Sequence, residues 1–206
     1  MKAFKTQIIS FESCSSELEE FKKLLDSKTE LEEKKDILPF FKKNQNIAAF
    51  IGTYFPGITI PDKIANEFDV FGDFTCDLAV GDSTSLTYLF VEFEDAKTNS
   101  LFKKNTRSTP DWSSRLEHGF SQVIDWLWKL DDMVRTDDYE SRFGAKDVEV
   151  HGLVVIGREE SMEDREKKRL KWRQNNTVVN TKKISVITYD QLYKDLKYRL
   201  SPYGSK

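Results

Sequence analysis

The chain has 206 residues, 38% of them hydrophobic and 13% aromatic, which is enough for a packed core and excludes a disordered chain. Its formal net charge of −3 argues against a strong, sequence-independent grip on nucleic acid, although local basic patches stay compatible with it. No apolar run is as long as a membrane span, the N-terminus lacks a signal-peptide pattern, and Cys14 and Cys76 suggest neither a disulfide framework nor a zinc site. We therefore expect a protein of the reducing cytoplasm with no membrane partner.

The first 35 residues are expected to form an extension of the main domain. Residues 2–11 alternate loosely and predict an edge strand. Ser16 and Glu19 have the spacing of a capping box, which predicts a charged helix from there to about Lys35, with a same-face pair from Glu30 to Lys34. The apolar stripe of this helix consists of Leu18, Phe21, Leu24, Leu25 and Leu31. We expect the helix to pack against the main domain, residues 36–206, or against a second subunit.

A second helical region is predicted over 36–55, with Pro39 in its first turn, and residues 67–71 predict a strand. Two further apolar runs with strand spacing, 74–80 and 87–93, flank a short polar turn and predict a β-hairpin.

Three carboxylates fall at one end of this hairpin. Glu92 and Glu94 project from the same face because side chains alternate along a strand, and Asp77 of the first strand can lie beside Glu92. Like charges this close either share protons or bind a cation, and Mg²⁺ takes carboxylate oxygens as ligands. The spacing alone leaves open a second interpretation, an acidic strand end in solvent with Asp77 hydrogen-bonded to a loop.

A polar stretch, 98–114, predicts a loop that carries Lys103, Lys104 and Arg107. Ser113 or Ser114 can cap the helix that follows, from Arg115 to about Met133. Its buried stripe is predicted to consist of Leu116, Phe120, Val123, Leu127 and Leu130. A neighbouring stripe holds Arg115, His118, Gln122 and Trp126. This second stripe could serve a metal-bound water or a phosphate, or His118 could be a surface histidine and Trp126 a core residue.

The remaining chain predicts strand, helix, strand and helix. Residues 148–157 are nearly all apolar, which is typical of a central buried strand. Ser161 can cap a basic helix over 162–174, which we expect to pack through Leu170 and Trp172 while its charges face solvent or touch phosphates. A last strand over 183–187 precedes a closing helix over 189–200.

The order of these elements, with Asp…Glu-x-Glu on the hairpin and Gln on the next helix, resembles the PD-(D/E)XK nuclease core, in which a central mixed β-sheet is flanked by helices. The resemblance sharpens to the Shedu-type nuclease family over roughly 37–198. The segments that carry it are FKKNQNIAAFI, FTCDLAVGD, VEFEDAK, EHGFSQVIDW, HGLVVIGR and ISVITYDQL. It implies an α/β protein with a restriction-endonuclease-like core.

The resemblance also implies Mg²⁺-dependent cleavage of DNA in prokaryotic defence against phage, by a protein that often assembles into homo-oligomers; Mn²⁺ can substitute for Mg²⁺. Asp77 matches the aspartate of the motif, Glu92 its acidic partner and Gln122 the glutamine of the helix. The chain departs from the pattern at Glu94, where lysine is usual, so that Glu94 would act as a general base or bind a second cation. The remaining residues implied at the site are the Phe93 carbonyl as a metal ligand and Lys97, Lys103, Lys104, Arg115 and His118 near the substrate.

Two other functions stay open at this point. The missing lysine and the net acidity are compatible with a nuclease fold that no longer cleaves and serves as a nucleic-acid or protein binding module. A nuclease that acts on RNA or on a nucleic-acid end is equally compatible with the sequence, because substrate choice depends on the shape of the cleft and on local basic surface.

Overall fold

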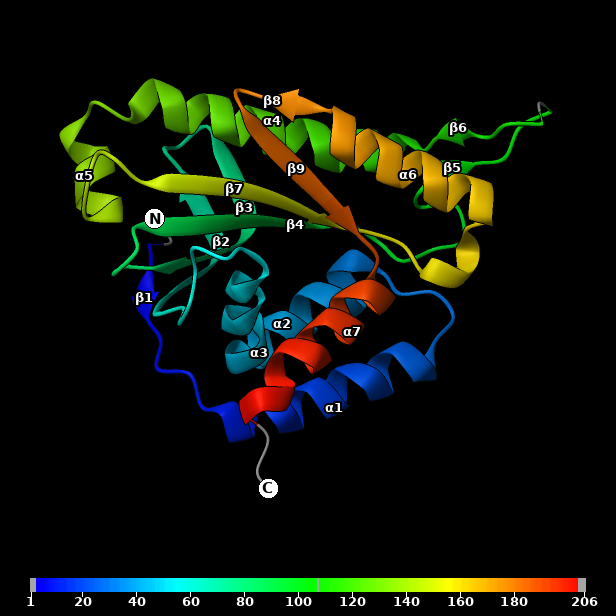
Figure 1. Ribbon diagram of the computed structural model, residues 1–206, viewed down its shortest axis with the longest axis horizontal. Coiled ribbons are helices and arrows are strands. Elements are labelled where there is room, and N and C mark those ends of the chain that lie inside the picture. Colours follow the sequence, from blue (N-terminus) through cyan, green and yellow to red (C-terminus); the bar gives the residue numbers. More distant parts are fainter. Residues whose placement is uncertain (1–2, 107, 204–206) are drawn as a thin grey trace.

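The computed structural model describes residues 3–106 and 108–203. These form a seven-stranded mixed sheet in the order β1-β2-β3-β4-β7-β9-β8, together with a small two-stranded sheet, β5-β6 (Figure 1). The strands are β1 (Lys5–Thr6), β2 (Lys63–Val70), β3 (Phe74–Asp82), β4 (Thr87–Phe93), β5 (Phe102–Lys103), β6 (Asp111–Trp112), β7 (Glu149–Val155), β8 (Val178–Val179) and β9 (Lys182–Ile187). Strands β1 to β4 pair antiparallel, whereas β4, β7 and β9 run parallel.

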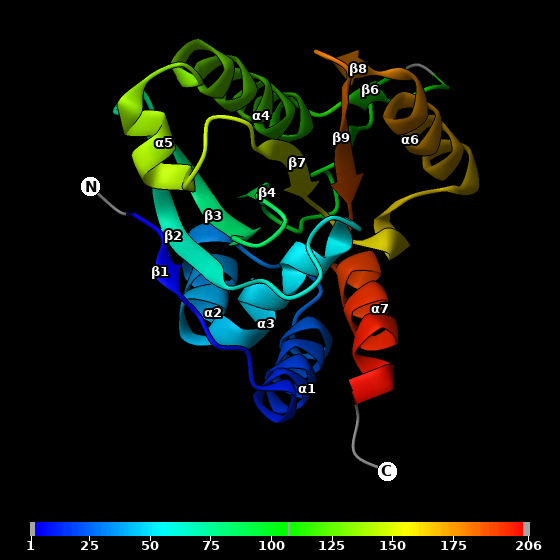
Figure 2. The same cartoon turned by 60° about the vertical axis from the view of Figure 1, so that its left-hand side comes forward.

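Helices cover both faces of the large sheet, and each face has its own apolar core. In Figures 1 and 2, α4, α5 and α6 lie on one face, and α1, α2, α3 and α7 lie on the other. The helices are α1 (Phe11–Ser27), α2 (Leu38–Lys43), α3 (Gln45–Phe50), α4 (Ser114–Met133), α5 (Asp137–Phe143), α6 (Asp164–Asn176) and α7 (Tyr189–Leu200), with one π-helical turn, η1 (Glu33–Ile37), before α2. The prediction of an α/β fold with a central mixed sheet between helices is therefore confirmed.

The apolar patterns explain how the middle of the sheet forms. All seven residues of β4 are buried, since Leu89, Val91 and Phe93 face the core beneath α1 and α7 while Tyr88 and Phe90 face the core beneath α4. The nearly continuous apolar run of β7 lies between β4 and β9, which is the position that a parallel strand buried on both faces requires. The predicted hairpin, central strand and closing helix are confirmed.

Helix α4 also follows its sequence pattern. The Ser113 hydroxyl accepts a hydrogen bond from the Leu116 amide and caps the helix. All five residues of the predicted stripe are buried. Among the described residues, no helix has both the length and the apolar character needed to cross a bilayer.

The N-terminal helix differs from its prediction. Helix α1 begins at Phe11 and is capped by Ser10, because a start at Ser16 would leave the fully buried Cys14 outside the helix. The Ser16 hydroxyl instead donates to the Ser13 carbonyl within the helix. The helix ends at Ser27, so Glu30 is not paired along a helix with Lys34 but accepts hydrogen bonds from Thr98. The edge strand predicted over 2–11 is present only as β1, which spans Lys5–Thr6.

Three further predictions are also wrong. Ser161 lies in a short 3₁₀ turn, and α6 is capped by Glu163 in a capping box with Glu166. Trp172 does not pack; its exposed fraction is 68%, whereas Leu170 is buried. The stretch 98–114 is not a plain loop, because it contains the β5-β6 pair, and Arg107 lies outside the described residues.

Candidate active site

The β3-β4 hairpin places the predicted carboxylates at one end of the sheet. The pairing of Leu78 with Val91 puts Asp77 beside Glu92 at the next position. The Asp77 carboxylate accepts a hydrogen bond of 2.9 Å from the Phe93 amide, which fixes the end of the hairpin. The Phe93 ring stacks on Phe41 across the opposite face, with ring centroids 4.5 Å apart. Glu92 therefore points away from that core and toward α4.

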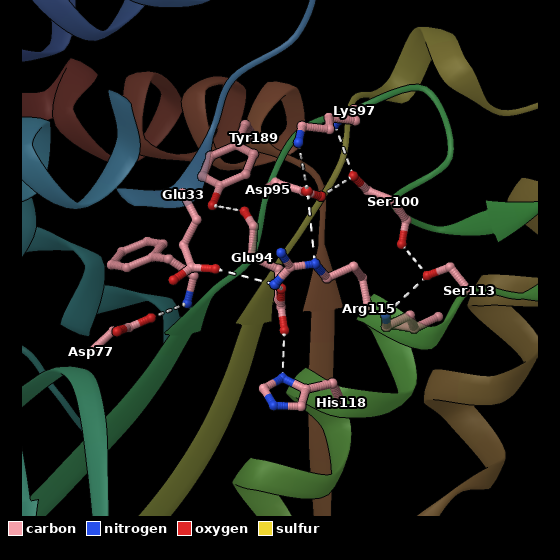
Figure 3. Close-up of polar contacts among 12 residues, drawn as sticks. Glu33, Asp77, Glu94, Asp95, Lys97, Ser100, Ser113, Arg115, His118 and Tyr189 are labelled. Carbon is pink, nitrogen blue, oxygen red and sulfur yellow. Dashed lines mark hydrogen bonds and ion pairs between the residues drawn. The ribbon is translucent and has the colours of Figure 1, made fainter. Parts of the chain in front are cut away.

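These acids border a cavity of about 430 Å³ between β3, β4, η1 and the first turns of α4. The residues that line it are all polar or charged, and they are Glu32, Glu33, Lys34, Thr75, Asp77, Glu92, Asp95, Lys97, Arg115, His118 and Gln122. Glu94 does not itself line the cavity: its exposed fraction is 1%, and its carboxylate contacts Arg115 and His118, which do line it (Figure 3). A cavity of this size and polarity can hold an ion together with part of a substrate.

Burial of like charges shifts the ionisation of the cluster. Removal from water raises the pKa of Glu92 well above its usual range, and the neighbouring carboxylates of Asp77 and Glu94 raise it further. Burial likewise raises the pKa of Asp77, although the hydrogen bond from the Phe93 amide opposes the shift. The pKa of Glu94 is also raised by burial, while its bonds to His118 and Arg115 counteract this. Within the described part of the chain, Asp77 and Glu92 form no ion pair, so they lack the positive charge that Glu94 receives from Arg115.

Helix α4 supplies the two partners of Glu94. Arg115 Nη1 lies 3.1 Å from one carboxylate oxygen, and His118 Nδ1 lies 3.0 Å from the other (Figure 3). The helix can approach β4 this closely because Gly119 faces Glu94; a Cβ atom at that position would lie 3.1 Å from Glu94 Cγ. The predicted stripe of Arg115, His118 and Gln122 is thus brought to the cavity, whereas Trp126 is buried in the core.

Three acidic residues that line the cavity, Glu32, Glu33 and Asp95, were not identified from the sequence. Glu33 of η1 reaches the cavity from the predicted N-terminal extension and lies 3.4 Å from Arg115 Nη1. Its charged neighbourhood in the sequence resembles a solvated helix, so no local signal distinguishes it. Asp95 accepts a hydrogen bond from Ser100 and lies 3.8 Å from Arg115 Nε. Asp95 follows directly on the Glu-x-Glu motif, which is a signal that could have included it.

The other predicted site residues separate into two groups. Gln122 lines the cavity, and its Oε1 is buried without a hydrogen-bond partner among the described residues. Lys97 also lines the cavity and lies 3.6 Å from Asp95. Lys103 and Lys104 are exposed at the β5-β6 pair and do not line it.

The donor atoms fit a divalent cation. One oxygen each of Glu92 and Glu94 and a ring nitrogen of His118 lie within 4.8 Å of one another, and this is the group of His, Cys, Asp or Glu side chains in the described part of the chain that could hold a metal ion. Asp77 lies outside this triple, next to Glu92. Carboxylate oxygens suit Mg²⁺ and Mn²⁺, and an imidazole nitrogen favours a transition metal. A cation here would offset the repulsion that raises the pKa of the carboxyl groups.

The fold and the site thus define a mixed α/β protein with a buried acidic cavity at the end of its central hairpin. Residues 30–193, most of the chain, match the family model described as Shedu protein SduA, C-terminal. The chain belongs to this Shedu family. No curated protein matches it.

Proposed function

We propose that this protein is a divalent-cation-dependent DNA endonuclease of the PD-(D/E)XK type that acts in prokaryotic defence against phage. The observation that carries the proposal is the cluster of three neighbouring carboxyl groups, Asp77, Glu92 and Glu94, at a polar cavity, where burial raises the pKa of each. Structural carboxylates are usually paired with cations, whereas a cluster short of positive charge is typical of a metal site. Membership of the Shedu family supports the defence role.

The ligands of the ion would be Asp77, Glu92 and the main-chain carbonyl of Phe93, with Mg²⁺ as the cation and Mn²⁺ as a substitute. Glu94 and His118 could hold a second ion, given the spacing of their donor atoms from Glu92. A bound cation would supply Lewis acidity toward the phosphodiester and lower the pKa of water at the site.

The other side chains would orient the attacking water and the phosphate, and one of them would accept a proton. Glu94, hydrogen-bonded to His118, would accept a proton from the attacking water, and the unpartnered Gln122 Oε1 would orient that water. Arg115 would supply the positive charge that lysine provides in most members of the superfamily, because its guanidinium lies beside Glu94 at that position. The substrate phosphate would contact Arg115 and Lys97 at the cavity mouth.

The proposal is tested by nicking of supercoiled plasmid DNA in Mg²⁺ or Mn²⁺. We expect Asp77→Asn and Glu92→Gln, which keep the side-chain shape, to reduce the rate by at least ~100-fold, since each removes a ligand of the ion. Asp125→Asn is the matched control, because Asp125 is an exposed acid on the same helix as Gln122. Equal nicking by all four proteins would remove the acidic cluster from the mechanism.

A second candidate function is a binding module with a nuclease-like fold that no longer cleaves. It is favoured by Glu94, whose two oxygens are already occupied by Arg115 and His118. Calorimetric titration with Mn²⁺ separates the two, since a binding module would take up no divalent ion with or without DNA. Parallel assays on RNA decide the nucleic-acid type. Homo-oligomer formation and a cytoplasmic location stay predictions.

A further inference from the structure

Helix α6 is the most basic element of an otherwise acidic protein. Its 13 residues include six lysine and arginine side chains, whereas its two acidic residues lie in the first turn, where Glu166 belongs to the capping box. The whole chain has a net charge of −3, so this helix carries a concentration of positive charge that the rest of the molecule does not share.

Some of these cations have structural roles. Arg173 forms a bidentate pair with Glu117 at 2.6 and 2.9 Å and lies over the rings of Trp112 and Phe120. Arg169 donates to the Pro110 carbonyl at 2.7 Å and stacks on Trp112. These contacts attach α6 to α4 and to the β5-β6 pair.

Other cations of α6 have no such role. Arg165, Lys168 and Lys171 are exposed and form no ion pair with any residue in the described ranges. Trp172 is 68% exposed and makes no ring contact within the same part of the chain. Spacings of three and four residues place all four side chains on one side of the helix. We call these four residues the α6 face.

Helix α6 covers the same face of the sheet as α4, but the α6 face is not part of the candidate active site. In Figures 1 and 2, α6 runs along the same face of the sheet as α4, next to the β5-β6 pair. Arg173 of α6 pairs with Glu117 of α4, which directly precedes His118 in the sequence. His118 lines the cavity, but none of the four residues of the α6 face does. Arg115, His118 and Gln122 line the cavity from one side of α4, whereas Glu117 projects from a different side of that helix, so the cavity and α6 lie on different sides of α4.

We propose that the α6 face binds an unpaired strand of nucleic acid, with its three cations on the phosphates and the Trp172 indole stacked on a base. Phosphates alone would account for the cations but not for an exposed tryptophan among them. Bases in a duplex are already stacked on one another, and inserting a side chain between them costs a few kcal/mol, so an indole stacks most readily on an unpaired base. The inference rests on the proposed function for the identity of the anionic polymer.

An anionic membrane surface fits this helix less well. A helix that lies on a membrane needs a broad apolar face beside its cations, with several apolar side chains. The remaining apolar residue of α6, Leu170, is buried against the sheet, so Trp172 is the one apolar side chain that the helix exposes. The surroundings of Trp172 thus favour a polymer with regularly spaced phosphates and accessible bases.

The experiment measures the fluorescence anisotropy of a labelled oligo(dT) of ~16 nucleotides with the full chain in EDTA, where a metal-dependent nuclease does not cleave. The variants are Trp172→Ala and the double variant Lys168→Glu with Lys171→Glu. The matched controls are Tyr198→Ala, which removes an aromatic ring that is 80% exposed on α7, and a double variant of two exposed lysines on α1 and α7, Lys23→Glu with Lys197→Glu. Melting temperatures verify that each protein is folded.

We expect Trp172→Ala to weaken binding about 5- to 100-fold, as for the loss of one stacked base. The charge-reversed double variant should weaken it at least tenfold and reduce the slope of log affinity against log salt by ~1.4, for two lost phosphate contacts. The controls should stay within about twofold of wild type, and wild type should prefer oligo(dT) over a duplex of equal length.

Three results would overturn the inference: no binding of oligo(dT) by wild type, equal weakening by the α6 variants and their controls, or binding to phosphatidylserine vesicles in place of the oligonucleotide. Because the assay needs no cleavage, it is separate from the proposed nuclease function. Binding that depends on α6 without any plasmid nicking would support nucleic-acid binding by the α6 face and refute the proposed nuclease activity. Plasmid nicking without oligonucleotide binding at α6 would support the nuclease activity and refute binding by the α6 face.

Discussion

Glu92 illustrates how a single buried acid connects stability with function. Its side chain is 6% exposed, and it lies among other carboxylates. In the protein without a cation, its charged form is disfavoured by the loss of hydration and by repulsion from Asp77. The folded protein therefore holds protons at this cluster over a pH range in which the unfolded chain has already released them, and this difference makes stability depend on pH.

From this we predict that Glu92→Gln stabilises the metal-free protein at pH ~8 but not at pH ~4. A carboxyl group whose pKa is raised by folding stabilises the folded state fully at pH values below its pKa in the unfolded chain. This contribution to stability is lost as the pH rises toward the raised pKa of the folded state. Glutamine cannot ionise, so the variant escapes that loss. We expect its melting temperature in EDTA to exceed that of wild type by ~2–4 °C at pH ~8 and to equal it at pH ~4.

Added Mn²⁺ provides the control for this prediction. It should raise the melting temperature of wild type and leave that of Glu92→Gln nearly unchanged, because the variant has lost a ligand. A variant less stable than wild type at both pH values would show that Glu92 is held by structural hydrogen bonds and not in a strained acidic cluster.

Arg115 is the residue that would replace the positive charge lost at position 94, where this chain has glutamate in place of the usual lysine. Its guanidinium lies within 4 Å of carboxylate oxygens of Glu33, Glu94 and Asp95, so it is the principal positive charge on that side of the cavity. We predict that Arg115→Ala reduces plasmid nicking by ~100-fold and that Arg115→Lys retains part of the rate, since lysine keeps the charge but loses the planar geometry.

Arg135→Ala is the matched control for Arg115, because it removes an exposed arginine just beyond the other end of α4. We expect its nicking rate to stay within about twofold of wild type, as for a surface substitution remote from the site. Full activity of Arg115→Ala would assign that guanidinium a purely structural role.

At the scale of elements, two glycines determine how closely α4 packs on the sheet. A Cβ atom at Gly119 would lie 3.1 Å from Glu94 Cγ, and one at Gly152 of β7 would lie 2.2 Å from Val123 Cγ1. The first contact is at the candidate site, whereas the second is in the core. The same substitution should therefore have different consequences at the two positions.

We predict that Gly119→Ala lowers nicking by ~10-fold or more with little change in melting temperature. The new methyl group displaces Glu94 by a few tenths of an ångström, while alanine gains up to ~1 kcal/mol of helix propensity, which offsets the strain. Gly152→Ala should destabilise the fold by ~1–3 kcal/mol through overpacking. Ser121→Ala, at an exposed position of α4, serves as control. A large loss of stability in Gly119→Ala with an unchanged rate per folded molecule would contradict the assignment.

The elements that the sequence predicted well are those whose signals are local. The hairpin follows from two alternating runs around a polar turn, and α4 follows from a serine cap and an apolar stripe. Glu33 could not be predicted, because it reaches the cavity only through the contact of Leu31 with Ala96, 65 positions further along the chain. The start of α6 was misplaced because Ser161 and Glu163 are both acceptable caps, and only Glu163 has its partner three residues later.

At the scale of the whole molecule, the question is whether the first 35 residues are a separable extension. Helix α1 buries Cys14, Leu18, Phe21 and Leu25 in the core shared with α3 and α7. The buried Arg158 holds its end in place, since its Nη1 donates to the carbonyls of Leu25 and Lys28 at 3.1 Å while the guanidinium also pairs with Asp190. These contacts join the N-terminal segment to the C-terminal half of the sheet.

We therefore predict that a chain that begins at residue 28 does not fold cooperatively and has no nicking activity. Truncation of one buried leucine or phenylalanine typically costs roughly 2–5 kcal/mol, and the loss of all the side chains that α1 buries would approach the entire stability of an ordinary domain, roughly 5–15 kcal/mol. Loss of α1 would also release the segment that brings Glu33 to the cavity. Thermal unfolding followed by circular dichroism, beside a control that lacks the residues from Ser201 onward, measures the effect. A shortened chain that melts as wild type does and still nicks DNA would show that α1 is an accessory element and that the acidic site is complete without it.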